Sequence, residues 1–264
     1  MKLFTIFGNP VSHSISPMMH NYALKGLKID GNYTKTHLED GSKLIQKFKS
    51  LGLDGANVTI PHKEFAYSLC DKPDEFAKTI GAVNTLVKKN NKIYGYNTDA
   101  SGFYKAIESF GKIKTALILG AGGTSKAIAT VLKKNSINIT VLNRSSKRLD
   151  YFKQNSIISY DLSNFKLDSY DLIINTTPAG LEDDSLPLNH NLLNQLMQKA
   201  KFAFDVIYNK KTPFLKLALE NKLTCKDGSN MLLFQGVLAF NLFFENSLNN
   251  KDIEKHMKKA FLGL

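Results

Sequence analysis

The sequence contains no tryptophan, only two cysteines and no apolar run near the roughly 20 residues that a membrane-spanning helix needs. Cys70 and Cys225 are isolated from each other and from any histidine cluster, which excludes a disulfide framework and a zinc site. At the N-terminus, a short apolar segment at 3–7 is interrupted by Gly8-Asn9-Pro10, so we expect no secretion signal. These absences predict a cytoplasmic protein with no metal centre and no membrane association.

Arginine is also scarce, although the formal net charge is +12. Of the 35 basic residues, 33 are lysines spread along the chain without a long basic run, and only Arg144 and Arg148 are arginines. Nucleic-acid binding favours a concentrated basic face, usually with arginine. We therefore interpret the lysines as a solvated surface and expect no nucleic-acid partner, while the positive field attracts anionic small molecules.

The length of 264 residues exceeds that of most single domains and favours two. Strand and helix patterns alternate in the first hundred residues, with Ser16 as the expected N-cap of the first helix and Pro17 following it. The strands are expected at 2–7, 33–38 and 56–60 and in a hairpin of 82–88 and 93–97, with a helix ending near Gly52. The pattern therefore predicts a mixed α/β domain in this region.

From about residue 100 the pattern becomes that of a doubly wound domain. Asp99 is expected to cap a helix, and a short, wholly apolar strand at 115–119 has the composition of a buried parallel strand. Further strands are expected at 139–142, 157–160, 172–175 and 202–207. Two helices, at 231–244 and 253–262, close the chain.

A glycine-rich turn follows the strand at 115–119 and leads into a helix. Backbone N–H groups and the positive end of the helix would there face a pyrophosphate. Gly120 permits the tight turn and Gly122 allows close approach, but Ser125 stands where a third glycine is usual. A plain structural turn is the alternative for this degenerate motif.

The next strand ends in Asn143 rather than in the carboxylate that would bind an NAD ribose. Arg144, Lys147 and Arg148 follow it, so both arginines of the chain lie where the 2′-phosphate of NADP would bind. The pattern predicts NADP(H) in preference to NAD(H), with an ordinary helix start as the alternative.

Short polar side chains cluster at turns and strand ends of the first hundred residues, in the segments 12–16, 57–63, 84–85 and 97–99. Hydroxyls at a helix start can hold an anion such as a carboxylate. Grouped hydroxyls and amides suit a polyhydroxylated ligand. Each cluster alone has a turn-forming alternative, and Lys63 is only one of 33 lysines.

Taken in order, these segments resemble the shikimate dehydrogenase family, NADP-dependent enzymes of chorismate and aromatic amino-acid biosynthesis. The resemblance covers nearly the whole chain through FGNPVSHSISPMMHN (7–21), GANVTIPHKE (55–64), GAVNTL (81–86), NTDASGF (97–103), LGAGGTSKA (119–127), NRSSKR (143–148), INTTPAGL (174–181), DVIYN (205–209), TPFL (212–215) and DGSNMLLFQG (227–236). Ser145 and Lys126 depart from the usual family residues, which are threonine and arginine.

The resemblance implies a substrate domain of residues 1–101, completed by C-terminal helices at 230–264, and a Rossmann-like NADP-binding domain of residues 102–229. It implies reversible, NADPH-dependent reduction of 3-dehydroshikimate to shikimate, with a homodimer as the candidate assembly. Lys63 and Asp99 would be the catalytic pair. The implied substrate-binding residues are Ser14, Ser16, Thr59, Lys63, Asn84, Asp99, Tyr208 and Gln235.

The resemblance also assigns the cofactor contacts, which are Gly120, Ala121, Gly122, Gly123, Thr124, Asn143, Arg144, Arg148, Thr177, Val206, Gly228 and Met231. Three other functions remain open. A paralogue acting on quinate would differ near Ser14 and Tyr208, whereas a non-catalytic NADP(H) sensor would bind cofactor without turnover. A nucleic-acid binder, suggested by charge alone, would bind a duplex in a salt-sensitive way.

Overall fold

A computed structural model describes residues 1–262; Gly263 and Leu264, the end of the predicted C-terminal segment, lie outside the described residues. The chain forms two compact units, Met1–Gly102 with Leu233–Leu264 and Phe103–Leu232. We call the first the terminal unit, because it holds both chain ends, and the second the central unit. The unit boundaries fall inside two helices, α5 (Asp99–Ile107) and α10 (Ser229–Phe243).

The terminal unit is built on one mixed sheet with the strand order β2-β1-β3-β5-β6-β4. Strand β1 pairs in parallel with both β2 and β3, whereas β5 is antiparallel to β3 and to β6. This confirms the predicted mixed α/β class. The strands are β1 (Lys2–Gly8), β2 (Gly31–His37), β3 (Gly55–Val58), β4 (Lys72–Pro73), β5 (Thr85–Lys89) and β6 (Lys92–Tyr96).

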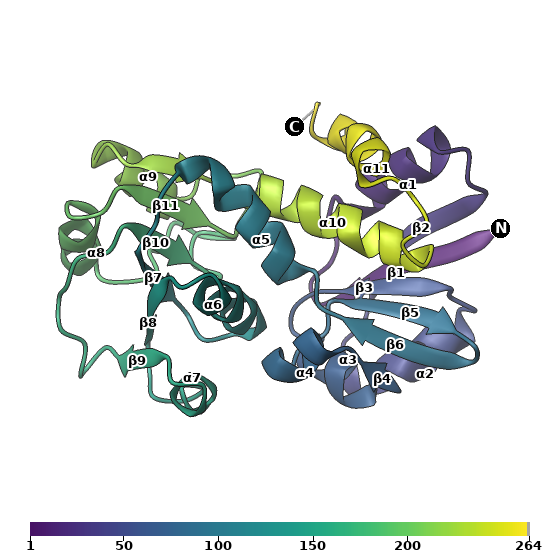
Figure 1. The fold of residues 1–264 in the computed structure, drawn as a ribbon, viewed down its shortest axis with the longest axis horizontal. Helices are drawn as coiled ribbons and strands as arrows, with labels where there is room; N and C mark the ends of the chain where they lie inside the picture. The colour runs from purple at the N-terminus through teal and green to yellow at the C-terminus, as the bar shows by residue number, and fades with distance from the viewer. Residues whose placement is uncertain (263–264) are drawn as a thin grey trace. The chain divides into compact units, whose positions relative to one another are not determined.

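Helices cover both faces of this sheet (Figure 1). On one face, α2 (Leu44–Ser50) and α3 (Lys63–Leu69) join a core that includes Phe7 and Phe48. Phe4 points to the opposite face, since side chains alternate along a strand, and its ring stacks on Phe243 of α10 at 4.7 Å. The remaining helical segments are α1 (Ser16–Gly26), η1 (Gly41–Lys43), α4 (Glu75–Ile80), α11 (Asn250–Met257) and η3 (Lys258–Phe261).

The predicted hairpin forms between β5 and β6, although β5 begins at Thr85 rather than at Ala82. Asn90 and Asn91 make its two-residue turn with φ values of +49° and +58°. A turn with both central residues in the left-handed region matches the twist of the strands, and asparagine tolerates that region well. At the other end of β5, Ala82–Asn84 lie outside the strand, in the loop that precedes it.

The central unit has a wholly parallel sheet with the order β12-β11-β10-β7-β8-β9. This is the doubly wound order, in which the strand sequence reverses between β7 and β10 and ligands bind at the carboxyl ends of the strands there. The strands are β7 (Thr115–Leu119), β8 (Asn138–Asn143), β9 (Ile158–Asp161), β10 (Leu172–Asn175), β11 (Phe202–Asp205) and β12 (Thr224–Lys226).

Helices form layers on the two faces of the central sheet (Figure 1). Helices α8 (His190–Met197) and α9 (Pro213–Glu220) pack with Leu117, Leu119 and Ala203 in one core. Phe204 points the other way and meets Phe103 of α5 edge-on at 5.0 Å. The other helical segments are η2 (Glu108–Phe110), α6 (Gly123–Lys134) and α7 (Asp150–Gln154).

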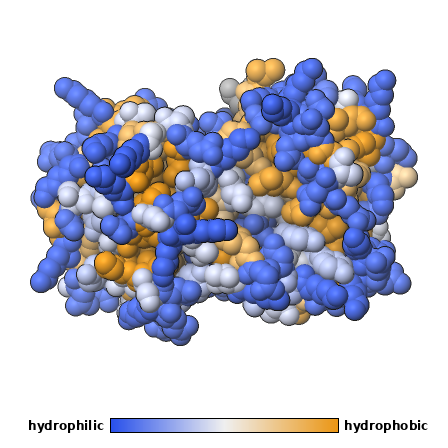
Figure 2. Space-filling view, viewed as in Figure 1, coloured by the Kyte–Doolittle hydropathy of each residue, from blue (hydrophilic) through white to orange (hydrophobic). Residues whose placement is uncertain are grey.

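Hydrophilic side chains cover much of the visible surface of each unit, with apolar residues interspersed (Figure 2). Among residues 1–262, no helix has both the length and the apolar character needed to cross a membrane.

Candidate active site

Lys63 and Asp99 form a shielded ion pair in the terminal unit. The Lys63 Nζ lies 2.6 Å from Asp99 Oδ2, and the two side chains are 13% and 8% exposed. Each is the first residue of its helix, α3 for Lys63 and α5 for Asp99. The strand expected at 56–60 ends at Val58, two residues earlier than predicted. Lys63 lies beyond the strand, at the start of α3. The predicted catalytic pair is therefore brought together.

Asn84 ties the Asp99 carboxylate to the neighbouring loop. Its Nδ2 donates to Asp99 Oδ1 and to Thr98 Oγ1, each at 2.9 Å, while its Oδ1 accepts from the Thr98 backbone N–H at 2.9 Å. Gln235 of α10 lies 3.4 Å from Asn84 Nδ2 through its Oε1. The structure thus joins Lys63, Asp99, Asn84 and Gln235 in one hydrogen-bonded group that can present amides and charges to ring hydroxyls.

The predicted carboxylate-binding serines lie at the start of α1. Ser14 and Ser16 are both buried, and the Ser16 backbone N–H donates to Ser14 Oγ at 3.3 Å. The expectation that Ser16 is the N-cap is wrong, because Ile15 precedes the helix and Ser16 is already its first residue. The Ser14 hydroxyl instead accepts from an N–H of the helix start, which accounts for a second serine at this turn.

These groups share one edge of the terminal sheet. Ser14 follows β1 and Thr59 follows β3, and the two strands are parallel neighbours. The Thr59 N–H donates to the Phe7 carbonyl at 2.8 Å, which joins the two strand ends. Asn84 precedes β5, which is antiparallel to β3, so it reaches the same edge. Predicted substrate residues from three segments of the chain therefore converge.

The glycine-rich turn of the central unit fits a dinucleotide phosphate. Gly120 adopts φ +108°, and α6 begins at Gly123. A Cβ added at Gly122 would meet no other atom within 4 Å, so the turn faces open space at the helix N-terminus. Ala121 and Thr124 complete the predicted turn. Backbone N–H groups and the helix dipole at such an end favour an anion.

Ser125 replaces the usual third glycine with a specific contact. Its Oγ accepts from the Gly122 N–H at 3.2 Å and lies 2.6 Å from Thr176 Oγ1, in the loop after β10. The side chain is fully buried. The departure from the glycine pattern therefore holds the turn in shape rather than blocking it.

The loop after β8 presents both arginines to solvent. The Asn143 Nδ2 donates to the carbonyls of Ser145 at 3.0 Å and Lys147 at 3.2 Å, which closes the loop on itself. Arg144 and Arg148 are exposed, and their guanidinium groups suit a phosphate. This loop can hold a 2′-phosphate. The sequence did not indicate that Asn143 also stabilises the loop through its side-chain amide.

Two buried polar residues missed by the sequence reasoning, Asn175 and Asp205, connect the loops after β10 and β11. Asn175 Nδ2 donates to Asp205 Oδ1 at 3.2 Å, and Asn175 Oδ1 accepts from the Thr177 hydroxyl at 2.7 Å. Asp205 Oδ2 accepts from the Thr212 hydroxyl at 2.6 Å. The sequence does give one indication of these residues, because each apolar strand ends in a polar residue: Asn175 ends LIIN and Asp205 ends FAFD.

Burial raises the pKa of Asp205 to about 6, although hydrogen bonds from Thr212, Ile207 and Asn175 oppose the shift. The carboxylate anchors a loop that carries two predicted residues, Val206 and Tyr208.

Two predicted cofactor residues are in direct contact. A Cβ added at Gly228 would lie 2.2 Å from the Val206 carbonyl oxygen, so only glycine allows this approach. The Gly228 N–H also donates to the Ile207 carbonyl at 3.0 Å. Met231 follows in α10 and is buried. The chain segments at 206 and 228–231 are thereby held side by side.

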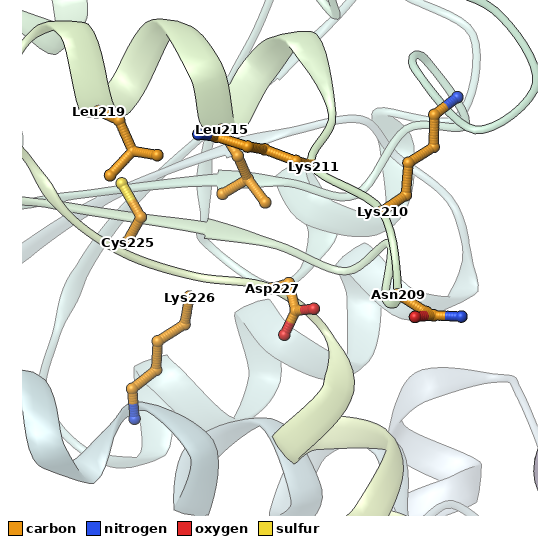
Figure 3. A pocket seen from close by; sticks show the side chains of 8 residues that line it. All are labelled: Asn209, Lys210, Lys211, Leu215, Leu219, Cys225, Lys226 and Asp227. Carbon is orange, nitrogen blue, oxygen red and sulfur yellow. The ribbon is translucent and has the colours of Figure 1, made fainter. Parts of the chain in front are cut away.

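An open pocket of about 420 Å³ lies elsewhere on the central unit, between α9, β12 and the loop at 209–211 (Figure 3). It contains none of the predicted site residues. Two of its lysines are engaged in the fold, since Lys210 donates to the Leu181 carbonyl at 3.0 Å and Lys226 to the Ala106 carbonyl at 2.7 Å.

Family models match both units of the chain. The shikimate dehydrogenase substrate binding domain matches residues 6–86, and the shikimate / quinate 5-dehydrogenase model matches residues 105–206.

Relatives are similar over nearly their full lengths. A shikimate dehydrogenase (NADP(+)) of Helicobacter hepaticus is 45% identical, with 100% of this chain and 98% of the relative covered. One of Methanococcus maripaludis is 37% identical, with 92% and 91% covered. The crystal structure of a Thermus thermophilus shikimate 5-dehydrogenase in complex with NADP(H) and shikimate is 31% identical, with a TM-score of 0.84 and 98% and 100% covered.

Proposed function

Because this chain belongs to the shikimate dehydrogenase family, we propose that it catalyses the reversible, NADPH-dependent reduction of 3-dehydroshikimate to shikimate. The observation that carries the proposal is the shielded Lys63–Asp99 pair with Asn84 hydrogen-bonded to its carboxylate. A protonated amine and an oriented carboxylate are the groups that reduction of a ring ketone beside a hydroxyl requires.

Proton transfer is assigned to Lys63. As hydride reaches the C3 carbonyl carbon, the C–O π bond breaks and negative charge grows on oxygen, so a donor must lie within hydrogen-bond reach. The Lys63 ammonium gives its proton to that oxygen and becomes a neutral amine. Asp99 orients the ammonium through Oδ2 and accepts a hydrogen bond from the adjacent ring hydroxyl. In the reverse direction, Lys63 takes the proton back.

Substrate binding is assigned to the edge of the terminal sheet. Ser14 and Ser16 hold the carboxylate with their hydroxyls at the α1 start, where the helix dipole favours an anion. Thr59, Asn84, Asp99 and Gln235 hold the ring hydroxyls. Tyr208 remains a predicted carboxylate contact from the family resemblance.

Cofactor binding is assigned to the central unit. The turn from Gly120 to Thr124 cradles the pyrophosphate, and Asn143, Arg144 and Arg148 bind the adenosine end with its 2′-phosphate. Thr177 and Val206 line the nicotinamide side, and Gly228 and Met231 close the cofactor pocket. When bound, NADPH supplies the hydride.

The direct test is absorbance-monitored reduction of NADP⁺ with shikimate, run beside NAD⁺ and beside quinate. Turnover confined to shikimate and NADP⁺ supports the proposal. Turnover with quinate alone would move the chain to the quinate branch that the second family model includes in its name. Cofactor binding without any turnover would indicate a sensor instead.

We also propose that the protein is located in the cytoplasm and forms a homodimer. Cys70 and Cys225 are both free thiols, which suits a reducing compartment. Sedimentation of the purified chain would test the dimer, and fractionation of the source cells would test the compartment.

A further inference from the structure

A line of buried hydrogen bonds runs through the terminal sheet and ends on the Asp99 carboxylate. The Tyr33 hydroxyl of β2 donates to Asn57 Oδ1 of β3 at 2.7 Å, and Asn57 Nδ2 lies 3.1 Å from Thr85 Oγ1 of β5. The Thr85 hydroxyl lies 3.0 Å from Asn84 Oδ1. Asn84 Nδ2 then donates to Asp99 Oδ1 at 2.9 Å.

Only one direction of donation satisfies this line. An ionised carboxylate only accepts, so Asn84 must present Nδ2 to Asp99 and Oδ1 to Thr85. Thr85 therefore donates its single hydroxyl hydrogen to Asn84 and accepts from Asn57 Nδ2. Asn57 Oδ1 is left to accept, and the Tyr33 hydroxyl supplies the donor at the far end. The Asn84 amide is therefore held in this orientation by the groups behind it together with the Thr98 backbone N–H, which donates to the same oxygen at 2.9 Å.

Water does not compete for these groups. Tyr33, Asn57, Asn84 and Thr85 are 2%, 5%, 3% and 0% exposed. The Tyr33 ring stacks on His20 at 4.2 Å, and burial raises the pKa of Tyr33 well above its usual value, so its hydroxyl stays a donor. A donor or acceptor left without its partner in such surroundings is costly, which favours a single arrangement.

We propose that Thr85, supported by Asn57 and Tyr33, is a positioning residue for the reaction. Its hydroxyl holds the Asn84 amide in the orientation that meets Asp99, and so fixes the carboxylate that orients Lys63. Thr85 acts through Asn84 and has no assigned contact with substrate. The inference rests on the proposed dehydrogenase activity and adds to it a determinant outside the binding residues.

Thr85→Val and Thr85→Ser separate this role from packing. Valine keeps the shape of the buried side chain but removes the hydroxyl, whereas serine keeps the hydroxyl and removes a methyl group. We expect Thr85→Val to lower kcat for shikimate oxidation about ten- to a hundred-fold, because small misplacement of catalytic groups has effects of that order. The kcat of Thr85→Ser should stay within about threefold of the wild-type value. A packing role would reverse the order.

Thr5→Val is the matched control. Thr5 is fully buried on β1 of the same sheet, and its hydroxyl bonds to the Thr34 carbonyl and Thr36 Oγ1 rather than to the line described above. It should lose thermal stability, as Thr85→Val does, yet keep its kcat. Tyr33→Phe provides a second, conservative variant, since it keeps the ring stacked on His20 and removes the terminal donor; it should lower kcat in the same direction.

The positioning role of Thr85 is tested by measuring kcat, KM for shikimate, thermal unfolding and NADP⁺ binding for all four variants. A fall in kcat in Thr85→Val and Tyr33→Phe, with NADP⁺ affinity unchanged, supports the proposal. Unchanged kcat in both variants, or an equal fall in Thr5→Val or Thr85→Ser, would overturn it. If the wild-type protein showed no turnover of shikimate with NADP⁺, the proposed dehydrogenase activity would be refuted, and this inference with it.

Discussion

The Lys63 ammonium lies 2.6 Å from an Asp99 carboxylate oxygen although the two residues begin different helices and are separated by 36 positions in the chain. The backbone supports the meeting, because the Val83 N–H donates to the Lys63 carbonyl at 2.9 Å and joins the start of α3 to the loop that carries Asn84. Two loops fixed to one sheet edge thus determine the geometry of the pair.

Lys63→Ala should lower kcat by about a hundred- to ten-thousand-fold, the usual effect of losing a general acid. NADP⁺ affinity should remain near normal, because the predicted cofactor contacts lie in the other unit. Steady-state kinetics and cofactor titration measure both. Lys49→Ala, at an exposed lysine of α2, is the control and should behave as the unchanged chain. A Lys63→Ala variant that kept most of its kcat would remove the catalytic assignment.

Arg144→Ala should weaken NADP⁺ binding far more than NAD⁺ binding, because the proposed function assigns the lost guanidinium to the 2′-phosphate, which NAD⁺ lacks. Isothermal titration with each cofactor measures the difference. Lys134→Ala, at an exposed position of α6, controls for loss of one positive charge. Equal weakening for the two cofactors would show a general structural role for Arg144.

Gly228→Ala should reduce the stability of the fold, whereas Gly122→Ala should weaken cofactor binding. The first places a Cβ 2.2 Å from the Val206 carbonyl oxygen, so we expect about 1–3 kcal/mol of destabilisation, typical of overpacking. The second meets open space at φ −86°, so unfolding should change little while NADP⁺ binding weakens. Urea unfolding and cofactor titration check the pair. The contact assignments would be wrong if Gly228→Ala kept full stability.

Asp205→Asn should alter how stability depends on pH. Burial raises the pKa of Asp205 from 3.8 to about 6, so between those values the folded chain binds more protons than the unfolded chain. The contribution of Asp205 is therefore fully present below about pH 4 and is lost as pH rises through 6. The shift corresponds to about 3 kcal/mol. Relative to the unchanged chain, Asp205→Asn should gain stability as pH rises from 4 to 7.

Urea unfolding at each pH measures that difference, with Asp171→Asn as the contrasting variant. The hydrogen bond from Lys201 is the largest cause that lowers the pKa of Asp171. Its contribution is therefore present above the unfolded pKa and is lost as pH falls, so Asp171→Asn should lose stability relative to the unchanged chain as pH rises. Parallel pH curves for Asp205→Asn and the unchanged chain would contradict the assignment of a raised pKa.

Local patterns were sufficient to predict several parts of the fold. The short gap between the expected strands at 82–88 and 93–97 indicates the hairpin, and the glycines after the strand at 115–119 indicate the turn into α6. These features depend on neighbours in sequence, and periodicity and turn chemistry report such features directly. The start of α3 at Lys63 is not among the predicted elements, which give only a strand at 56–60 in this part of the chain.

Long-range hydrogen bonding was not predictable in the same way. The link from Asn175 to Asp205 depends on β10 and β11 being neighbours in register. The link from Asn57 to Thr85 likewise depends on β3 and β5 being paired. Periodicity shows that strands exist but not which strands pair, so polar residues at strand ends were visible in the sequence while their partners were not.

The buried line from Tyr33 to Asp99 also bears on the entropy of catalysis. The amide of Asn84 and the carboxylate of Asp99 are held by protein partners on several sides, so their side-chain torsions are restricted when the chain folds. Ordering that accompanies folding does not have to be repeated at each substrate encounter. Folding of the terminal sheet thus incurs in advance an orientational cost that a looser site would meet in every turnover.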